Sequence, residues 1–108
     1  MIARVWFGRT KAEDSDTYLA YLEESGVAAL KETPGNRGVI VLRRHEGDEA
    51  EFGVVSFWEA LDDVRVFAGE DIDVARYFPD DERFLLEFTP TLKHFEVARG
   101  SVLPSHRR

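Results

Sequence analysis

The sequence contains no cysteine, which excludes disulfide bonds, thiolate catalysis and metal sites built on cysteine. It also lacks any apolar run near the roughly 18 residues of a membrane span, and no charged segment followed by a long apolar one opens the chain. We therefore expect a cytoplasmic protein with no membrane partner. Basic residues are few, with 14 Lys and Arg against 21 Asp and Glu. The net charge of -7 argues against nucleic acid as a partner.

The sequence does contain enough apolar material for one folded domain. Its 108 residues are 44% hydrophobic and 12% aromatic, well above the composition of disordered chains. This length is too short for two independent cores. No internal repeat, low-complexity tract or Gly/Ser linker divides the chain. We predict a single globular domain.

Hydrophobic periodicity and turn residues predict the elements of this domain. A helix begins at Asp14 or Ser15 and ends near Lys31, with Gly26 as a weak point. A second helix covers residues 60–68 and ends at Gly69, and one or two further helical turns are expected within residues 80–88. Four strands are expected, with a hairpin joining the second to the third, at residues 2–9, 38–44, 51–58 and 91–98.

The resulting order, β-α-β-β-α-β, is the pattern of a ferredoxin-like sandwich of the α+β class. In such a sheet one face normally meets water and carries polar residues. Here Phe52, Val54 and Trp58 lie on one face of the third strand, while Val55 and Phe57 lie on the other. The first and second strands are apolar on both faces in the same way. Helices hide one face, so a second copy of the sheet is predicted to cover the other.

Several short motifs resemble the antibiotic biosynthesis monooxygenase family of dimeric α/β barrels. They are Thr33-Pro34-Gly35 before the second strand, Trp58-Glu59-Ala60 after the third, Phe67-Ala68-Gly69, and the closing His94-Phe95-Glu96-Val97. The resemblance covers residues 1–98, taken as an antibiotic biosynthesis monooxygenase-like domain, and leaves residues 99–108 as a C-terminal extension. It implies a homodimer with a small-molecule cleft in each subunit, between sheet and helices.

The resemblance also suggests which residues form the site. In relatives a tryptophan at the end of the third strand lines the cleft, where an indole supplies an apolar wall and one N–H donor. Trp58 is therefore a candidate catalytic residue, or else it fills the core. His94 is a candidate general base, or a structural histidine bonded to a neighbouring strand or across the dimer. Arg76 binds an anionic substrate or forms a surface ion pair. The candidate substrate-binding residues are Trp6, Phe67, Arg76 and Tyr77.

The activity we expect is cofactor-independent oxygenation of a small aromatic or polyketide-like substrate by O₂, with no cofactor and no metal. Haem degradation on this scaffold uses a cleft histidine and an asparagine near the end of the first strand, where this chain has Gly8. No histidine occurs between His45 and His94, and His45 has no partner at metal-ligand spacing. The alternatives are a non-catalytic small-ligand-binding or stress-related barrel protein and, less favoured, haem-degrading or isomerase-like activity.

The C-terminal extension reads RGSVLPSHRR and includes His106. Val102 and Leu103 are its large apolar side chains, and three arginines make it basic in an acidic protein. We predict that it lies across the partner subunit, with Val102 and Leu103 in an apolar groove.

Overall fold

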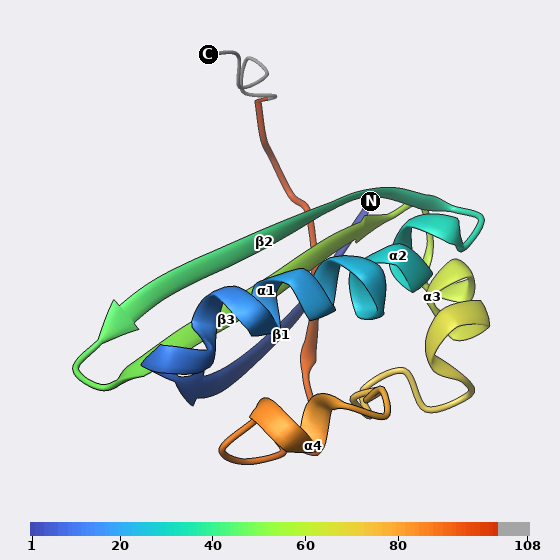
Figure 1. Cartoon of the computed structure of the whole chain (residues 1–108). Coiled ribbons are helices and arrows are strands. Elements are labelled where there is room, and N and C mark those ends of the chain that lie inside the picture. The colour runs from blue at the N-terminus through green and yellow to red at the C-terminus, as the bar shows by residue number, and fades with distance from the viewer. Residues whose placement is uncertain (102–108) are drawn as a thin grey trace.

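The structure, a computed structural model, describes residues 1–101, so the prediction for Val102 and Leu103 lies outside the described residues. It contains one antiparallel sheet in the order β2-β3-β1-β4 (Figure 1). The strands are β1 (Ile2–Lys11), β2 (Asn36–Glu46), β3 (Glu49–Trp58) and β4 (Lys93–Glu96). This order places β1 and β3 in the centre, and it confirms the ferredoxin-like α+β class. The predicted β2–β3 hairpin is also present, with a turn at Gly47 and Asp48.

The helices differ more from the predicted ones than the strands do. They are α1 (Ser15–Glu24), α2 (Gly26–Glu32), α3 (Leu61–Ala68) and α4 (Asp81–Phe84), with a 3-10 turn η1 (Ala12–Asp14) before α1. The prediction of one continuous first helix is wrong, because the backbone breaks at Ser25, with φ -112° and ψ -92°. The Ser25 hydroxyl donates to the Tyr21 carbonyl at 2.6 Å, a local bond that competes with the helix.

The turn between α2 and β2 depends on Gly35. Its φ of 89° lies in the left-handed region, and a Cβ there would stand 2.2 Å from Cγ of Asp63 in α3. Glu59 donates its backbone N–H to the Gly35 carbonyl at 3.0 Å. This hydrogen bond connects the Thr33-Pro34-Gly35 turn to the end of β3, and it fixes the position of the turn between α2 and β2.

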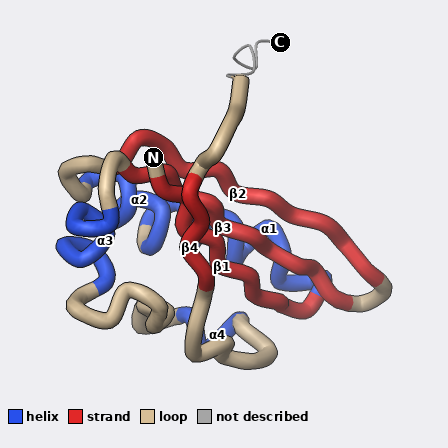
Figure 2. The backbone as a smooth tube through the Cα atoms, turned by 180° about the vertical axis from the view of Figure 1, so that it is seen from behind, coloured by secondary structure: helices blue, strands red, loops and turns tan. Residues whose placement is uncertain are grey.

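The two faces of the sheet have different surroundings. α1 and α2 lie along one face, and the core between them and the sheet includes Tyr18, Leu22, Phe52 and Trp58 (Figure 1). Seen from behind, the strands lie in front of the helices and carry no helix on the near side (Figure 2). Apolar side chains on this open face are about half exposed: Phe7 49%, Ile40 49%, Leu42 48% and Phe95 52%. The predicted apolar character of both faces is confirmed.

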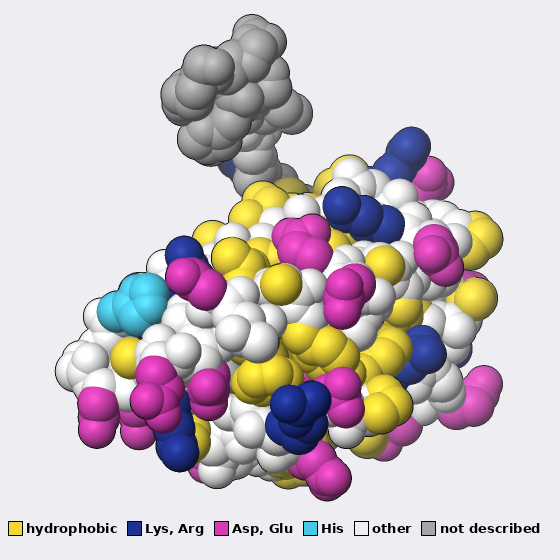
Figure 3. Space-filling view, viewed as in Figure 1, with side chains coloured by type: hydrophobic (Ala, Val, Ile, Leu, Met, Phe, Trp, Pro, Cys, Tyr) yellow, Lys and Arg dark blue, Asp and Glu magenta, His cyan; other side chains and the backbone are white. Residues whose placement is uncertain are grey.

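No described helix has the length and apolar character needed to cross a membrane. On the helix-covered side acidic side chains are dispersed, and the basic ones do not gather into a patch (Figure 3). Within residues 1–101 no group of three or more His, Cys, Asp or Glu side chains has the arrangement of a metal site.

Candidate functional site

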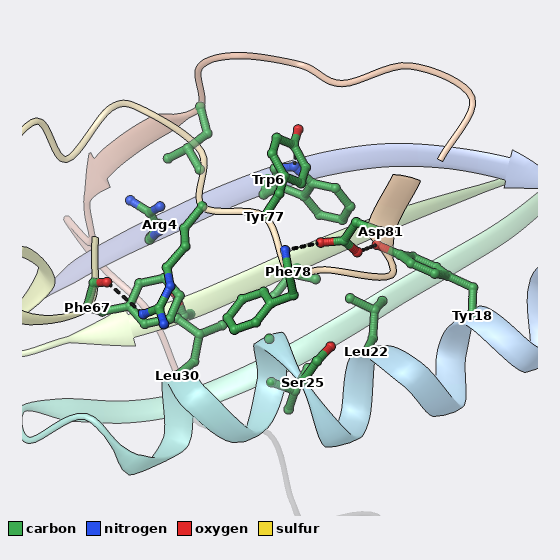
Figure 4. A pocket seen from close by; sticks show the side chains of 16 residues that line it. Arg4, Trp6, Tyr18, Leu22, Ser25, Leu30, Phe67, Tyr77, Phe78 and Asp81 are labelled. Carbon is green, nitrogen blue, oxygen red and sulfur yellow. Dashed lines mark hydrogen bonds between the residues drawn. The ribbon is translucent and has the colours of Figure 1, made fainter. Parts of the chain in front are cut away.

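A pocket lies between the central strands, the helices α1 and α2, and the segment that leads into α4 (Figure 4). Its volume is about 60 Å³, and most of its lining is aromatic or aliphatic. All four predicted substrate-binding residues line it, namely Trp6, Phe67, Arg76 and Tyr77. The tertiary structure therefore brings together residues that are up to 71 positions apart in the chain. Binding of a substrate by them remains a proposal.

Trp6 and Tyr77 form one side of the pocket. The Trp6 indole N–H donates to the Tyr77 hydroxyl at 3.2 Å, and that hydroxyl donates to the Thr89 carbonyl at 2.6 Å. A Cβ on Gly8 would stand 2.5 Å from the Trp6 ring, so the glycine leaves the space that the indole occupies. Both polar groups are satisfied by the protein, and this side offers a ligand mainly apolar surface.

A row of polar side chains crosses the sheet beneath the pocket. The register pairs Arg4 of β1 with Ser56 of β3 on one side and with His94 of β4 on the other. Arg4 is only 4% exposed, although it lies on the apolar, helix-covered face between Ile2 and Trp6. Its Nη1 donates to the Ile72 carbonyl at 2.6 Å and contacts His94 Nε2 at 3.0 Å. A charged residue is therefore buried at the centre of the sheet.

The hydrogen bonds of His94 determine its tautomer. A guanidinium can only donate, so Nε2 of His94 accepts from Arg4, and Nδ1 carries the proton that is donated to Asp73 at 3.1 Å. Burial lowers the pKa of His94, which keeps the ring neutral. Both nitrogens are engaged, and His94 does not line the pocket. This geometry does not suit the predicted general base. It matches the alternative of a structural histidine, one that positions Arg4.

Trp58 also differs from its predicted placement. It is fully buried and does not line the pocket, so it is not the predicted wall of the cleft. Its indole N–H donates to Ser56 Oγ at 2.9 Å rather than into the cavity. Its ring packs near Phe67, at 6.3 Å between centroids. Trp58 thus lies in the core and adjoins the pocket through two of its lining residues, Ser56 and Phe67.

Arg76 lies at the opening of the pocket and is exposed. Its guanidinium stands over the rings of Phe67 and Phe78, at 4.8 Å and 4.9 Å from their centroids. Its Nη1 donates to the Phe67 carbonyl at 2.9 Å. The alternative of a surface ion pair does not hold within residues 1–101, because no carboxylate there lies within 4.0 Å of it.

Asp81 is a pocket residue that the sequence analysis missed. It is 4% exposed, and its carboxylate accepts from the Tyr18 hydroxyl at 3.0 Å and from the Phe78 backbone N–H at 2.6 Å (Figure 4). Burial raises the pKa of Asp81, although both hydrogen bonds act in the opposite direction. Burial and the Asp81 carboxylate also raise the pKa of Tyr18, so the phenol keeps its proton. The site thus holds a buried carboxyl of increased basicity beside a neutral phenol.

Arg4 gave a signal in the sequence, because a single charge interrupts the apolar face formed by Ile2 and Trp6. Asp81 gave none. It stands between Asp80 and Glu82, and the three together resemble an ordinary acidic helix start. Asp81 is buried, unlike Asp80 and Glu82, only because α4 packs against Tyr18 in the folded chain.

Comparison with solved structures finds a similar fold in a crystal structure of a mutant of MhuD with two manganese protoporphyrin IX molecules bound per active site. The TM-score is 0.59, with 20% identity, covering 94% of this chain and 99% of that chain. The fold is ferredoxin-like. At this identity the likeness extends to the fold and no further. No family model matches the chain, and no curated protein matches it.

The residues of this pocket do not fit a porphyrin held by a histidine. Among residues 1–101 the lining contains no histidine, His94 is engaged by Arg4 and Asp73, and His45 lies in the exposed part of β2. The hydroxyls of Tyr18 and Tyr77 already form hydrogen bonds with protein groups. A cavity of about 60 Å³ is also too small for a macrocycle.

Proposed function

We propose that this protein is a cofactor-independent monooxygenase that oxidises a small electron-rich aromatic substrate, such as a monocyclic hydroquinone, with O₂. The observation that carries the proposal is Asp81, a buried carboxyl of raised pKa on the wall of a pocket lined by aromatic side chains. A group of this kind can remove a phenolic proton in a site with little water. The resulting phenolate is electron-rich enough to react with O₂.

The reaction balances without an external reductant. A hydroquinone and O₂ give a hydroxyquinone and water: one oxygen atom enters the ring, the other leaves as water, and the substrate supplies all four electrons. The protein's tasks are deprotonation, orientation and exclusion of water. Asp81 performs the first, while Trp6, Phe67 and Tyr77 hold the ring. In this proposal His94 and Trp58 act indirectly, through Arg4 and Ser56.

The assembly that accompanies this function is a homodimer formed through the open face of the sheet. Four large apolar side chains on that face are about half exposed, and β-sheets with such faces are normally covered. A second copy related by a two-fold axis would present the same apolar face and bury both. The pocket lies on the opposite face, so each subunit would keep its own site.

The test is oxygen incorporation. The purified protein is given methylhydroquinone in ¹⁸O₂, and mass spectrometry follows a hydroxyquinone carrying one ¹⁸O atom, with the protein-free autoxidation rate subtracted. The proposal expects protein-dependent formation of this product, at a rate that Asp81→Asn lowers. If methylhydroquinone binds but neither it nor other hydroquinones or anthrones are oxidised above the protein-free rate, the alternative of a non-catalytic ligand-binding protein replaces the proposal.

A further inference from the structure

The arginines of the described chain fall into two groups. Six of them form ion pairs with carboxylates: Arg9, Arg37, Arg43, Arg44, Arg65 and Arg83. Arg4, Arg76 and Arg99 form none within residues 1–101, and of these three Arg4 and Arg76 line the pocket beside the same ring, that of Phe67. In a protein of net charge -7, two neighbouring cations without a carboxylate partner leave a locally positive site.

Arg4 is the more informative of the two because it is buried. Burial lowers its pKa to about 10, so the guanidinium remains charged at neutral pH. Its hydrogen bonds to described residues all use Nη1, and none involves Nη2 or Nε. A buried cation with unused donors has a large desolvation cost, which an anion at the same place would offset. The nearest carboxylate in this network, on Asp73, is already bonded to His94.

Ser56 adds a second unused donor next to Arg4. Its oxygen accepts the Trp58 N–H, so the hydroxyl proton points elsewhere, and no acceptor for that proton lies among the described residues. The cross-strand neighbour Arg4 cannot accept, since a guanidinium has donors only. Ser56 is 1% exposed and lines the pocket. Two buried side chains of adjacent strands therefore present donors that have no acceptor within residues 1–101.

We propose that this end of the pocket, formed by Arg4 and Ser56 with Arg76 at the opening, is an anion subsite that binds the carboxylate of a small aromatic acid. A carboxylate matches a planar guanidinium in geometry and charge. One buried guanidinium and one hydroxyl suit a singly charged group better than a phosphate dianion. The apolar lining suits an aromatic ring, and the small volume argues against a larger ring system. Trp58 and His94 are positioning residues, because they orient Ser56 and Arg4.

This inference rests on the proposed function for one point only, that the ligand is also the substrate. Arg4 and Asp81 lie at different ends of the pocket (Figure 4). A dihydroxybenzoate bound with its carboxylate at Arg4 would extend its ring past Trp6 toward Asp81. The substrate class would then be a hydroquinone that carries a carboxylate.

The test compares two single-ring probes that differ in charge, benzoate and benzyl alcohol. Isothermal titration calorimetry at low ionic strength measures each affinity, and Trp fluorescence serves as a second readout because Trp6 lines the pocket. We expect benzoate to bind at least about tenfold more tightly than benzyl alcohol. Equal affinities, or tighter binding of the alcohol, would overturn the proposal. Inorganic phosphate is the third probe, and its binding more tightly than benzoate would also overturn the assignment to a carboxylate.

Variants then locate the site. Ser56→Ala and Arg76→Gln should each weaken benzoate binding several-fold and leave benzyl alcohol binding unchanged. Arg4→Gln should abolish the preference for the anion, with Arg4→Lys as a charge-preserving variant should the glutamine not fold. Arg65→Gln, at an exposed ion pair of α3, is the matched control and should bind both probes normally. A normal preference in both Ser56→Ala and Arg76→Gln would contradict the proposal even if neither Arg4 variant folds.

The outcomes of this test and of the oxygen assay are independent. A charge preference without oxygen incorporation would retain the anion subsite and reject the monooxygenase. Oxygen incorporation into methylhydroquinone without a charge preference would retain the monooxygenase and reject the anion subsite.

Discussion

The two faces of one sheet depart from the usual pattern in opposite ways. The helix-covered face, which should be apolar, contains the buried polar row of Ser56, Arg4 and His94. The open face, which should be polar, exposes Phe7 and Leu42 on either side of Gly53. Each departure costs free energy in the isolated chain, because burial removes water from the Arg4 cation on one face and apolar groups meet water on the other.

Both faces of the isolated chain thus carry groups in unfavourable surroundings, for different reasons. A bound anion that accepts hydrogen bonds would lower this cost on the covered face. A second apolar surface that excludes water would lower it on the open face. The polar groups of the covered face occupy a small area and need a partner in a defined direction, as expected for recognition of a small molecule. The apolar side chains of the open face cover a broad area and need no defined direction, as expected for association of two protein subunits.

The largest effect is expected at Asp81, on the covered side. Asp81→Asn should lower the rate of oxygen incorporation by about 10²–10⁴-fold, because the base is lost. In the native protein the rate should increase with pH through the raised pKa of Asp81, since only the carboxylate accepts a proton. Benzoate affinity should be unchanged. Glu82→Gln, an exposed neighbour in α4, is the control and should keep full activity.

A charge on the open face should separate the two copies. Leu42→Glu would place two symmetry-related carboxylates in the interface, and we expect the dimer Kd to increase by about 100-fold or more. Analytical ultracentrifugation across a concentration series measures this. Val66→Glu in α3 is the matched control, because Val66 is 71% exposed but lies outside the sheet. A native protein that is monomeric at micromolar concentration would reject the dimer.

Replacing Trp58 tests the connection from the core to the pocket. Trp58→Phe keeps most of the apolar volume but removes the N–H that orients Ser56, so benzoate should bind about 2–10-fold more weakly while the fold is retained. Circular dichroism checks the fold and calorimetry the affinity. If Trp58 serves the core alone, benzoate affinity will not change. The double variant with Ser56→Ala should then bind no more weakly than Ser56→Ala itself, because the indole acts through that hydroxyl.

The smallest effect concerns pH and His94. The pKa of His94 is lowered in the folded state, so the unfolded chain binds its proton more readily. Its contribution to stability is present above the ordinary histidine pKa, near 6.5, and should be lost as the pH falls below that value. In His94→Gln the amide can still accept from Arg4 and donate to Asp73, but it does not titrate. Urea unfolding between about pH 5 and 8 should show a shallower pH dependence in this variant.

Much of the fold could be predicted because strand patterns are local. Two predicted strands, residues 2–9 and 51–58, are rich in β-branched and aromatic side chains. In the structure each of these strands is longer than predicted. The break at Ser25 had only the weak point at Gly26 as a signal in the sequence, because the helical period continues through it. Of the predicted site residues, Trp6, Phe67, Arg76 and Tyr77 line the pocket, whereas Trp58 and His94 lie behind it, and their role as a site stays a prediction.

The sequence by itself determined the class of the fold, the apolar character of both sheet faces, and the absence of cysteine chemistry. These follow from composition and from period-two alternation, which act over a few residues. Only the tertiary structure decided which polar groups meet. The register of β1 against β3 and β4 puts Arg4 between Ser56 and His94, and the return of α4 to α1 puts Asp81 against Tyr18. Contacts across 63 to 90 positions depend on the packing of the whole chain, which no local pattern specifies.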